Sequence, residues 1–334
     1  MRIVVTGSLA YDYIMNFPGY FKDHILPEKV HMLSVSFLVD SMRRMRGGVA
    51  GNIAYTLALL GERPRVFATA GHDFGDYRAW LQRQGVDTAS IRIIEDEFTA
   101  SCFFNTDRDN NQIVAFYTGA AAHSRHLSIS ELGLGPHDFV IISPTDPEAM
   151  SRHAAECRQH GIPFLFDPGK QTPRLSGDQI LAGLTGASVL VGNDYEFAMM
   201  AQHTGKSEQE LIESTPLTVV TRGAQGSTIY TRSEQHGRPV VESIDIPIAP
   251  IREILDPTGA GDAYLGGLVF GLARRMPLPV AGRIAALAAA YAVEYHGCQE
   301  HTYTIDEFVR RYTEAFGTAS EIEALLSSVS GSAS

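Results

Sequence analysis

Short apolar runs rich in valine, isoleucine and phenylalanine alternate along the chain with longer segments in which apolar residues recur at helical spacing. The apolar runs predict strands at about residues 2–6, 65–70, 138–143, 163–167, 187–192 and 217–222. Helices are predicted between them, each followed by a glycine that permits a left-handed cap, at 50–60, 74–84 and 147–160. Alternation of strand and helix predicts an α/β protein with a mainly parallel central sheet and helices on both of its faces.

Polar residues occupy the positions where several of the predicted strands end. They are Ser8, Ser143, Asp167, Asn193 and Thr221. In open α/β sheets, ligands bind at the carboxyl ends of the parallel strands. We therefore expect these residues to converge on one ligand site, although they lie far apart in the sequence.

Two segments, 13–45 and 98–118, lack helical periodicity and contain extended runs at 29–39 and 101–117. Asp and Asn residues at 106–111 interrupt the second run and predict a hairpin turn. We predict that both segments form a small β-sheet lid, which would exclude water from the ligand site. The exposed face of this lid could also pair with a second subunit and give a homodimer.

The remainder of the chain is assigned to one large α/β domain. This domain is built from residues 1–12, 46–97 and 119–326. A chain of 334 residues with 44% hydrophobic residues is long enough to bury a core of that size. Residues 327–334 are mostly small and polar and are predicted to form a flexible tail.

Residues 256–262 read Asp-Pro-Thr-Gly-Ala-Gly-Asp and stand directly before an apolar helical stretch. The glycines let the backbone turn tightly and point N–H groups at one place, where the helix dipole also favours negative charge. Asp262 would stand beside an anion held there and could take a proton from a hydroxyl group. The simpler interpretation is a tight turn with an acid that complements the dipole. Two acids and a hydroxyl within seven residues favour phosphoryl transfer to an alcohol, because the acids repel unless a cation or proton intervenes.

This heptapeptide and the residues that follow it, as far as Gly271, resemble the carboxyl-terminal signature of the ribokinase (PfkB) family of carbohydrate and nucleoside kinases. Four further segments resemble other motifs of the family and occur in the expected order, at 7–12, 47–52, 193–196 and 221–226. The resemblance implies a ribokinase-like three-layer α/β/α sandwich with a small β-sheet lid, and an ATP-dependent kinase that uses Mg²⁺. Within the family, residues 17–52 are most similar to bacterial adenosine kinases.

The family motifs imply a role for each matching residue. Asp262 would be the catalytic base, and N–H groups of Gly259, Ala260 and Gly261 would stabilise the transferring phosphoryl group. The substrate would be bound by Ser8, Asp12, Gly47, Gly48, Asn52, Phe116 and Asp262. ATP would be bound by Asn193, Thr221, Gly223, Gly226 and Gly261. Mg²⁺ would be steered through water by Asn193 and Glu196. Asp256 and Thr258 would either hold a monovalent cation such as K⁺ or only order the loop.

Recognition of the base is the point at which the chain departs from the adenosine kinases. Those enzymes hold adenine between two aromatic side chains of the lid. Phe116 matches one of them, but Cys102 stands at the place of the other. Strand alternation sends Phe103 to the opposite face of the lid, which makes Phe104 the better substitute.

The predicted reaction is transfer of the γ-phosphate of ATP to the 5′-hydroxyl of a nucleoside, with adenosine the first choice and AMP the product, as in purine salvage. A PfkB-type kinase for a free sugar such as ribose or fructose is one alternative. A nucleoside kinase of broad specificity is another. A non-catalytic nucleoside-binding protein is disfavoured, because such a protein does not need a base aimed at an anion site.

Charge and composition narrow the expected partners to a nucleoside or sugar and ATP. The net charge is −11 and the basic cluster at 43–46 is short, which argues against a nucleic-acid partner. That cluster is interpreted either as a solvated strand edge or as positive charge near the ATP phosphates. The 3 cysteines are widely separated and support neither disulfides nor a zinc site. The apolar runs are too short for a signal peptide or a membrane span, so we expect a cytoplasmic protein without a membrane partner.

Overall fold

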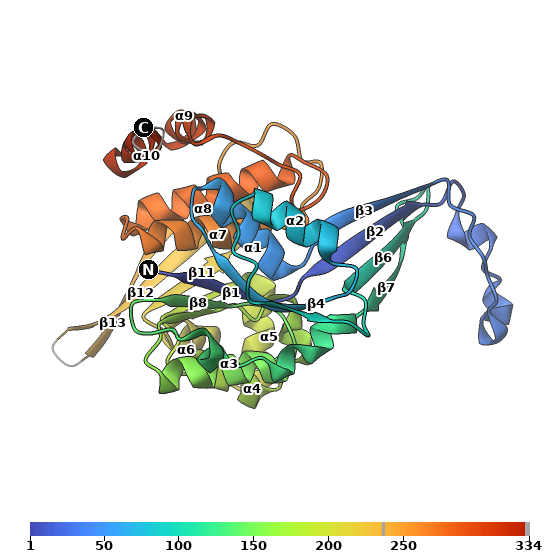
Figure 1. Cartoon of the computed structure of the whole chain (residues 1–334), viewed down its shortest axis with the longest axis horizontal. Helices are drawn as coiled ribbons and strands as arrows, with labels where there is room; N and C mark the ends of the chain where they lie inside the picture. Colours follow the sequence, from blue (N-terminus) through green and yellow to red (C-terminus); the bar gives the residue numbers. More distant parts are fainter. Residues whose placement is uncertain (236–237, 331–334) are drawn as a thin grey trace.

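The computed structural model describes residues 1–235 and 238–330, and contains within them a nine-stranded sheet and a four-stranded sheet. Helices lie on both faces of the large sheet, and the small sheet extends away from one end of it (Figure 1). Within the same two residue ranges, none of the helices combines the length and the apolar character that crossing a membrane requires.

The large sheet is mainly parallel, in the order β13-β12-β11-β10-β9-β8-β1-β4-β5. Its strands are β1 (Ile3–Thr6), β4 (Arg65–Gly71), β5 (Ile91–Ile94), β8 (Phe139–Ile142), β9 (Phe164–Phe166), β10 (Val189–Asn193), β11 (Leu217–Thr221), β12 (Ser227–Gln235) and β13 (Arg238–Ile246). The strands predicted from the apolar runs are found as β1, β4, β8, β9, β10 and β11, and neighbours among them pair in parallel. β5 extends one edge in parallel, whereas β12 and β13 extend the other edge as an antiparallel pair that was not predicted.

The helices form two layers, as the predicted sandwich requires (Figure 1). One face of the sheet is covered by α1 (Val49–Leu59), α2 (Gly75–Arg83), α7 (Ala260–Ala273) and α8 (Leu278–Val293), with α9 (Ile305–Phe316) and α10 (Ser320–Ser330) beyond them. The other face carries α3 (Pro147–Gln159), α4 (Gly177–Leu184), α5 (Asp194–Thr204) and α6 (Glu208–Ile212). Short 3-10 segments are η1 (Phe21–Asp23), η2 (Pro27–Met32), η3 (Gly119–His126), η4 (Ile129–Leu132), η5 (Gly169–Arg174) and η6 (Gly223–Gln225). The predicted three-layer fold class is confirmed.

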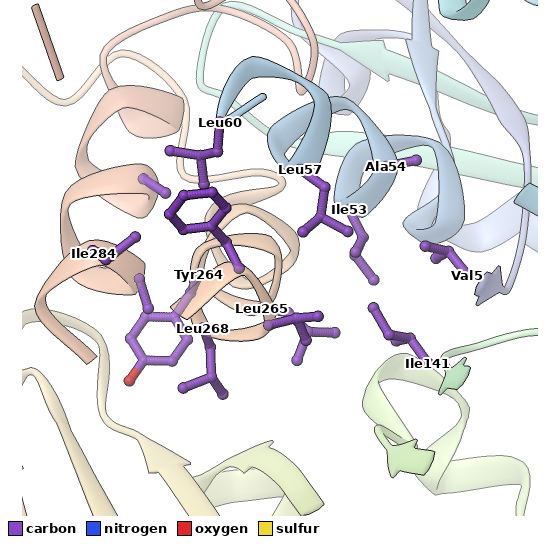
Figure 2. Close-up of a cluster of buried hydrophobic side chains, with 14 of the residues drawn as sticks. Val5, Ile53, Ala54, Leu57, Leu60, Ile141, Tyr264, Leu265, Leu268 and Ile284 are labelled. Carbon is purple, nitrogen blue, oxygen red and sulfur yellow. The ribbon is translucent and has the colours of Figure 1, made fainter. Parts of the chain in front are cut away.

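The hydrophobic core on the first face fixes the position of helix α7. Leu265 and Leu268 of α7 lie among side chains of α1, α8 and the sheet (Figure 2), and each buried leucine contributes about 1.5–3 kcal/mol. Glycines let α7 and α8 approach closely, since a Cβ atom at Gly267 would lie 2.8 Å from the Cα atom of Ala285. The amino-terminal end of α7, which carries the heptapeptide signature, is therefore held rigidly against the sheet.

The small sheet matches the predicted lid and has the strand order β3-β2-β6-β7. Its strands are β2 (Ala10–Asn16), β3 (Ser41–Gly47), β6 (Ala100–Thr106) and β7 (Gln112–Tyr117). The predicted hairpin is present as β6 and β7, and the carboxylate of Asp107 in its turn accepts N–H bonds from Asp109 and Asn111. Because β2 begins at Ala10 and β3 ends at Gly47, the sheet extends slightly beyond both ends of the predicted segment 13–45.

The extended run predicted at 29–39 is wrong. Residues 27–32 form the 3-10 segment η2, and 33–39 belong to no strand. Within residues 1–235 and 238–330, no strand pairs with this part of the chain. Phe37 instead packs on Phe17 and Phe21, with ring centroids 5.1 and 4.8 Å away. It projects from the far end of the lid (Figure 1).

The predicted tail at 327–334 begins as helix. Helix α10 continues to Ser330, so the first part of the predicted tail has regular backbone structure. Residues 331–334 lie outside the described residues.

Candidate active site

A cavity of about 430 Å³ opens at the carboxyl ends of the parallel strands, between the large sheet and the lid. Its lining includes most of the predicted site residues, drawn from both sheets and from α1, α5 and α7. They are Ser8, Asp12, Gly48, Asn52, Phe116, Asn193, Glu196, Thr221, Thr258, Gly259, Gly261 and Asp262. Of the strand-end residues expected to converge, Ser8, Asp167, Asn193 and Thr221 line the cavity. Ser143 does not: it is buried, and its hydroxyl donates to the carbonyl of Thr6.

The cavity lies where the order of the strands reverses. From β1 the chain proceeds to β4 and β5 on one side, and from β8 to β11 on the other, so the loops after β1 and β8 diverge and leave a crevice. The N–H group of Ser8 donates to the carbonyl of Pro144 at 2.9 Å, which fastens these two loops at the crevice. The Ser8 hydroxyl in turn accepts the N–H of Val49, at the start of α1.

Gly259 shapes the amino-terminal end of α7. Its φ of +81° lies in the left-handed region, and a Cβ atom there would lie 2.9 Å from the sulfur of Cys298. Glycine therefore lets the loop turn tightly into the helix, whose amino-terminal end meets the cavity at Gly259 and Gly261. A helix end of this kind favours an anion. Asp262 lies in the first turn and Gly261 lines the cavity, whereas the N–H of Ala260 already donates to the Pro257 carbonyl at 3.3 Å.

A buried hydrogen-bond chain orients Asp262. Asn52 Nδ2 donates to Asp262 Oδ2 at 2.7 Å, and Asn52 Oδ1 accepts from Gln299 Nε2 at 2.9 Å. Gln299 Nε2 also contacts the hydroxyl of Tyr77, which donates to the Gly47 carbonyl. Gln299 donates to the amide oxygen of Asn52. The NH₂ group of Asn52 therefore faces the Asp262 carboxylate.

The carboxylates in this cavity are hard to ionise. Burial raises the pKa of Asp262 to about 6, although the Asn52 hydrogen bond and the charge of Lys170 oppose the increase. Burial also raises the pKa of Asp12 to about 6 against the influence of Lys170. The pKa of Asp167 is raised further, by burial and by nearby acidic groups. Perturbed carboxylates gathered in a cleft are typical of catalytic sites.

The lid side of the cavity carries one carboxylate and an aromatic surface. Asp12 lies on β2, and glycine is required opposite it, since a Cβ atom at Gly47 would lie 2.6 Å from Asp12 Oδ2. Phe116, Phe104 and Cys102 line the cavity, with Cys102 opposite Phe116 in the strand register.

Phe103 points away from the cavity, as predicted from strand alternation. It stacks on Tyr13 with ring centroids 4.8 Å apart, on the other face of the lid. The choice of Phe104 over Phe103 as a cavity-lining aromatic is therefore confirmed.

The opposite end of the cavity is formed by the start of α5 and the end of β11. Asn193 and Glu196 make a capping box, in which the Glu196 N–H donates to Asn193 Oδ1 and the Asn193 N–H to Glu196 Oε2, both at 2.8 Å. Both residues line the cavity, as does Thr221.

Gly223 and Gly226 lie in the turn between β11 and β12 and are not among the described residues that line the cavity. Gly226 has φ +83°, and a Cβ atom there would lie 2.2 Å from the carbonyl oxygen of Ile246. A Cβ atom at Gly223 would meet no neighbour. These glycines shape the turn that follows Thr221.

The likeness to known proteins extends over the same elements that build this cavity. A model of the pfkB family of carbohydrate kinases matches residues 2–305. The chain belongs to this family. It is therefore a phosphotransferase that acts on an alcohol group.

Several relatives of this PfkB-family kinase are nucleoside kinases. The nucleoside kinase of Methanocaldococcus jannaschii is 30% identical over 312 residues, which are 93% of this chain and 96% of the relative. The structure of Burkholderia thailandensis nucleoside kinase in complex with inosine has a TM-score of 0.82 and 35% identity, and the match covers 95% of this chain and 99% of that one. The complex of the same protein with ADP-inosine has a TM-score of 0.79, 36% identity, and coverage of 95% and 97%.

In this kinase, the Asp256 carboxylate accepts hydrogen bonds from nearby backbone N–H groups. Its Oδ1 accepts the N–H of Thr258 at 2.9 Å and its Oδ2 the N–H of Gly297 at 3.1 Å. Both carboxylate oxygens thus order the backbone around the heptapeptide, as in the loop-ordering interpretation. A monovalent cation at Asp256 and Thr258 stays a prediction.

The basic cluster at 43–46 is a strand edge. These residues belong to β3, the outer strand of the lid, where Arg44 lies 4.6 Å from the ring centroid of Tyr11 and Arg46 4.4 Å from that of Trp80. Neither arginine is among the described residues that line the cavity. This favours the interpretation as a solvated edge over a role near the ATP phosphates.

The cavity and its hydrogen-bond network also contain polar residues that had not been assigned to the site from the sequence. Among them are Tyr77, Lys170, Cys298 and Gln299. Lys170 lies three positions after Asp167, which had been noted at a strand end, so its place in the sequence was a signal for the site. Gln299 and Tyr77 carry no motif, and only the folded chain brings them to Asn52.

Proposed function

We propose that this PfkB-family enzyme is an ATP-dependent nucleoside kinase, which transfers the γ-phosphate to the 5′-hydroxyl of a nucleoside. The observation that carries the proposal is the placement of Asp262 at the amino-terminal end of α7, in one cavity with Asp12 and with lid aromatics. A base beside an anion-binding helix end suits phosphoryl transfer, and an aromatic wall suits an acceptor that carries a base. The nucleoside kinases among its relatives and structural neighbours support this choice.

The acceptor end is assigned to the lid and α1. Asp12 and Asn52, with backbone groups of Gly48, would bind the ribose hydroxyls, since a carboxylate and an amide can each satisfy more than one hydroxyl group. Phe116 and Phe104 would contact the base from the lid. Because the ribose is held at this end, its 5′-hydroxyl would point toward Asp262.

The transfer step is assigned to α7. The Asp262 carboxylate would accept the 5′-hydroxyl proton as the oxygen attacks the γ-phosphorus, and N–H groups of Gly259 and Gly261 would stabilise the charge on the transferring group. ATP would lie along Thr221 and the turn that contains Gly223 and Gly226.

Mg²⁺ fits the phosphate end of the cavity as a hydrated ion. The described residues contain no group of three or more His, Cys, Asp or Glu side chains that could hold a metal. Asn193 and Glu196 already bond each other's backbone, which suits contacts through water better than direct ligation. When bound, the ion would neutralise phosphate charge.

The preferred nucleoside is proposed to be adenosine, with the product AMP feeding purine salvage, and broad specificity is the second candidate. Cys102 supports the second candidate, because a small thiol opposite Phe116 leaves base contact to fewer aromatic groups. A panel of adenosine, inosine, guanosine, cytidine, uridine, ribose and fructose, assayed by ADP release, tests both. We expect nucleosides to exceed free sugars in kcat/KM. Equal turnover of ribose and adenosine would refute the proposal.

The pH dependence of the reaction follows from the raised pKa values. Asp262 must be ionised to act as base, so kcat/KM for the nucleoside should be constant well above pH 6 and fall as the pH drops through about 6. Asp12 titrates in the same range, which should steepen the fall. In Asp12→Asn the fall should become shallower while its midpoint stays near that of Asp262. A profile that is flat down to pH 5 would contradict the assignment of Asp262 as base.

A further inference from the structure

Lys170 is a single ammonium group among the carboxyl groups of the cavity. Among the described residues that line the cavity, no other side chain is a lysine or arginine, whereas Asp12, Asp167, Glu196 and Asp262 are acidic. The Lys170 side chain is exposed and forms no ion pair within 4.0 Å in the described part of the chain. Its charge is therefore not committed to one carboxylate.

The backbone that carries Lys170 is fixed, although the side chain is long. Gly169 has φ +43°, and a Cβ atom there would lie 2.6 Å from Cγ of Pro144, so the turn after β9 packs directly against the loop after β8. The Thr172 hydroxyl donates to the Gly169 carbonyl at 2.7 Å and closes the turn. Lys170 thus lines the cavity from a fixed turn that packs against the loop after β8.

The ammonium acts on groups from three different elements. Its charge lowers the pKa of Asp12 on β2, of Glu196 on α5 and of Asp262 on α7. All three groups line the same cavity, the first from the lid, the second from the start of α5 and the third from the start of α7. Lys170 is therefore near the path along which a phosphoryl group would pass.

ATP brings further negative charge into a cavity that is already acidic. The charge of the transferring group is spread over its three equatorial oxygens and must be stabilised by positive groups that are already in place. The amino-terminal end of α7 supplies partial charges, and Lys170 is the full positive charge that the cavity's own side chains offer.

We propose that the ammonium of Lys170 binds the oxygens of the γ-phosphoryl group during transfer and is a catalytic residue. This inference rests on the proposed function. The acceptor oxygen forms a bond to the γ-phosphorus, the bond from that phosphorus to the β,γ-bridging oxygen breaks, and ADP leaves. The acceptor proton passes to Asp262, while Lys170 stays protonated throughout.

Lys170→Met and Lys170→Gln, with Lys170→Arg and Lys206→Met as controls, test this role. Lys206 is a surface lysine that lies 3.9 Å from Glu210 and outside the cavity lining. We expect both neutral variants to lower kcat by about 100-fold, the cost of losing one group that stabilises the transferring charge. The dissociation constant of the nucleoside, measured by calorimetry without ATP, should change less than about 3-fold.

The controls separate charge from structure. Lys170→Arg keeps the charge on a group of different shape, so its kcat should be about 10-fold higher than that of the neutral variants. The kcat of Lys206→Met should equal that of the wild type. In Lys170→Met the acid fall of kcat/KM should also move to higher pH, because Asp262 loses a neighbouring positive charge. An unchanged kcat in the neutral variants would overturn the proposal. So would a loss of nucleoside affinity as large as the loss of kcat/KM, which would make Lys170 an acceptor-binding residue.

Failure of the proposed function can be told apart from failure of this inference. If the wild type phosphorylates no nucleoside, the proposed acceptor is wrong. The same variants are then compared in the hydrolysis of ATP by water, which needs no nucleoside. A similar loss in that reaction supports the role of Lys170, and equal hydrolysis by wild type and Lys170→Met refutes it.

Discussion

Replacement of Asp262 by asparagine is expected to lower kcat by about 100- to 10,000-fold, the range that a positioned general base contributes. The amide has nearly the shape of the carboxylate, and its oxygen can still accept the hydrogen bond that Asn52 Nδ2 makes to this side chain. It cannot take the proton of the attacking hydroxyl. Steady-state kinetics with the best nucleoside of the panel measures the effect, and calorimetry measures nucleoside binding, which should be largely retained.

The thermal stability of Asp262→Asn is not expected to fall with its activity. A carboxylate whose pKa is raised by folding opposes folding at neutral pH, so the melting temperature of Asp262→Asn should equal or exceed that of the wild type. Asp306→Asn is the matched control, because Asp306 also lies in the first turn of a helix, α9, but at the surface. It should leave kcat unchanged. Loss of nucleoside binding in Asp262→Asn, in proportion to activity, would show that Asp262 anchors the substrate instead.

The largest loss of stability is expected from Arg311→Met. The Arg311 guanidinium makes two contacts to Glu294, at 2.5 and 2.9 Å, and also donates to the Pro250 carbonyl. Both side chains are at least 90% buried, with 9% and 8% exposed. Removal of one partner leaves a buried charge unpaired, which costs about 3–5 kcal/mol of unfolding free energy. Urea denaturation followed by circular dichroism measures the change.

Arg92→Met is the matched control for this ion pair. Arg92 lies 2.8 Å from Glu131, but both side chains are almost half exposed, so its loss should cost less than about 1 kcal/mol. The double replacement Arg311→Met with Glu294→Leu should recover much of the stability, because neither charge is then buried. Equal destabilisation by Arg92→Met and Arg311→Met would contradict the importance of burial.

The pH dependence of the Arg311 effect has a definite sign. Burial tends to raise the pKa of Glu294, but the hydrogen bonds and charge of Arg311 and the Arg252 N–H outweigh it, so the pKa is lowered. The stabilisation is therefore present above the ordinary pKa of a glutamate and is lost as the pH falls through the lowered value. The difference in stability between wild type and Arg311→Met should shrink at acid pH.

The fold and the outline of the site could be predicted because their signals are local. Buried parallel strands such as β8 and β10 are continuous apolar runs, and glycines such as Gly259 mark turns that no other residue makes easily. Strand-end residues then meet at one edge as a consequence of parallel topology. The edge strands β12 and β13 were missed because they mix polar and apolar residues and form no apolar run.

The remaining parts of the site depend on contacts across the sequence. Gln299 is an ordinary polar residue until it is buried between Tyr77 and Asn52, which are separated from it by 222 and 247 positions. Lys170 becomes notable only when four acidic side chains share its cavity. The strand expected at 29–39 does not form, because a sequence favourable for a strand forms one only where a partner strand is available.

Asp12 and Asp262 belong to different parts of the molecule, the small sheet of the lid and the packed helix α7. Strand β2 follows β1 after residues 7–9, and Asp12 is part of the lid, while Asp262 is built into the packed helix α7. An outward movement of the lid about its several connections to the large domain, residues 7–9 among them, would carry away the group that holds the acceptor and leave the base in place. ATP entering an open enzyme would then meet a base with no alcohol beside it. A nucleoside that bridged the two parts would draw the lid inward, so that the acceptor itself would complete the site and shut out competing water.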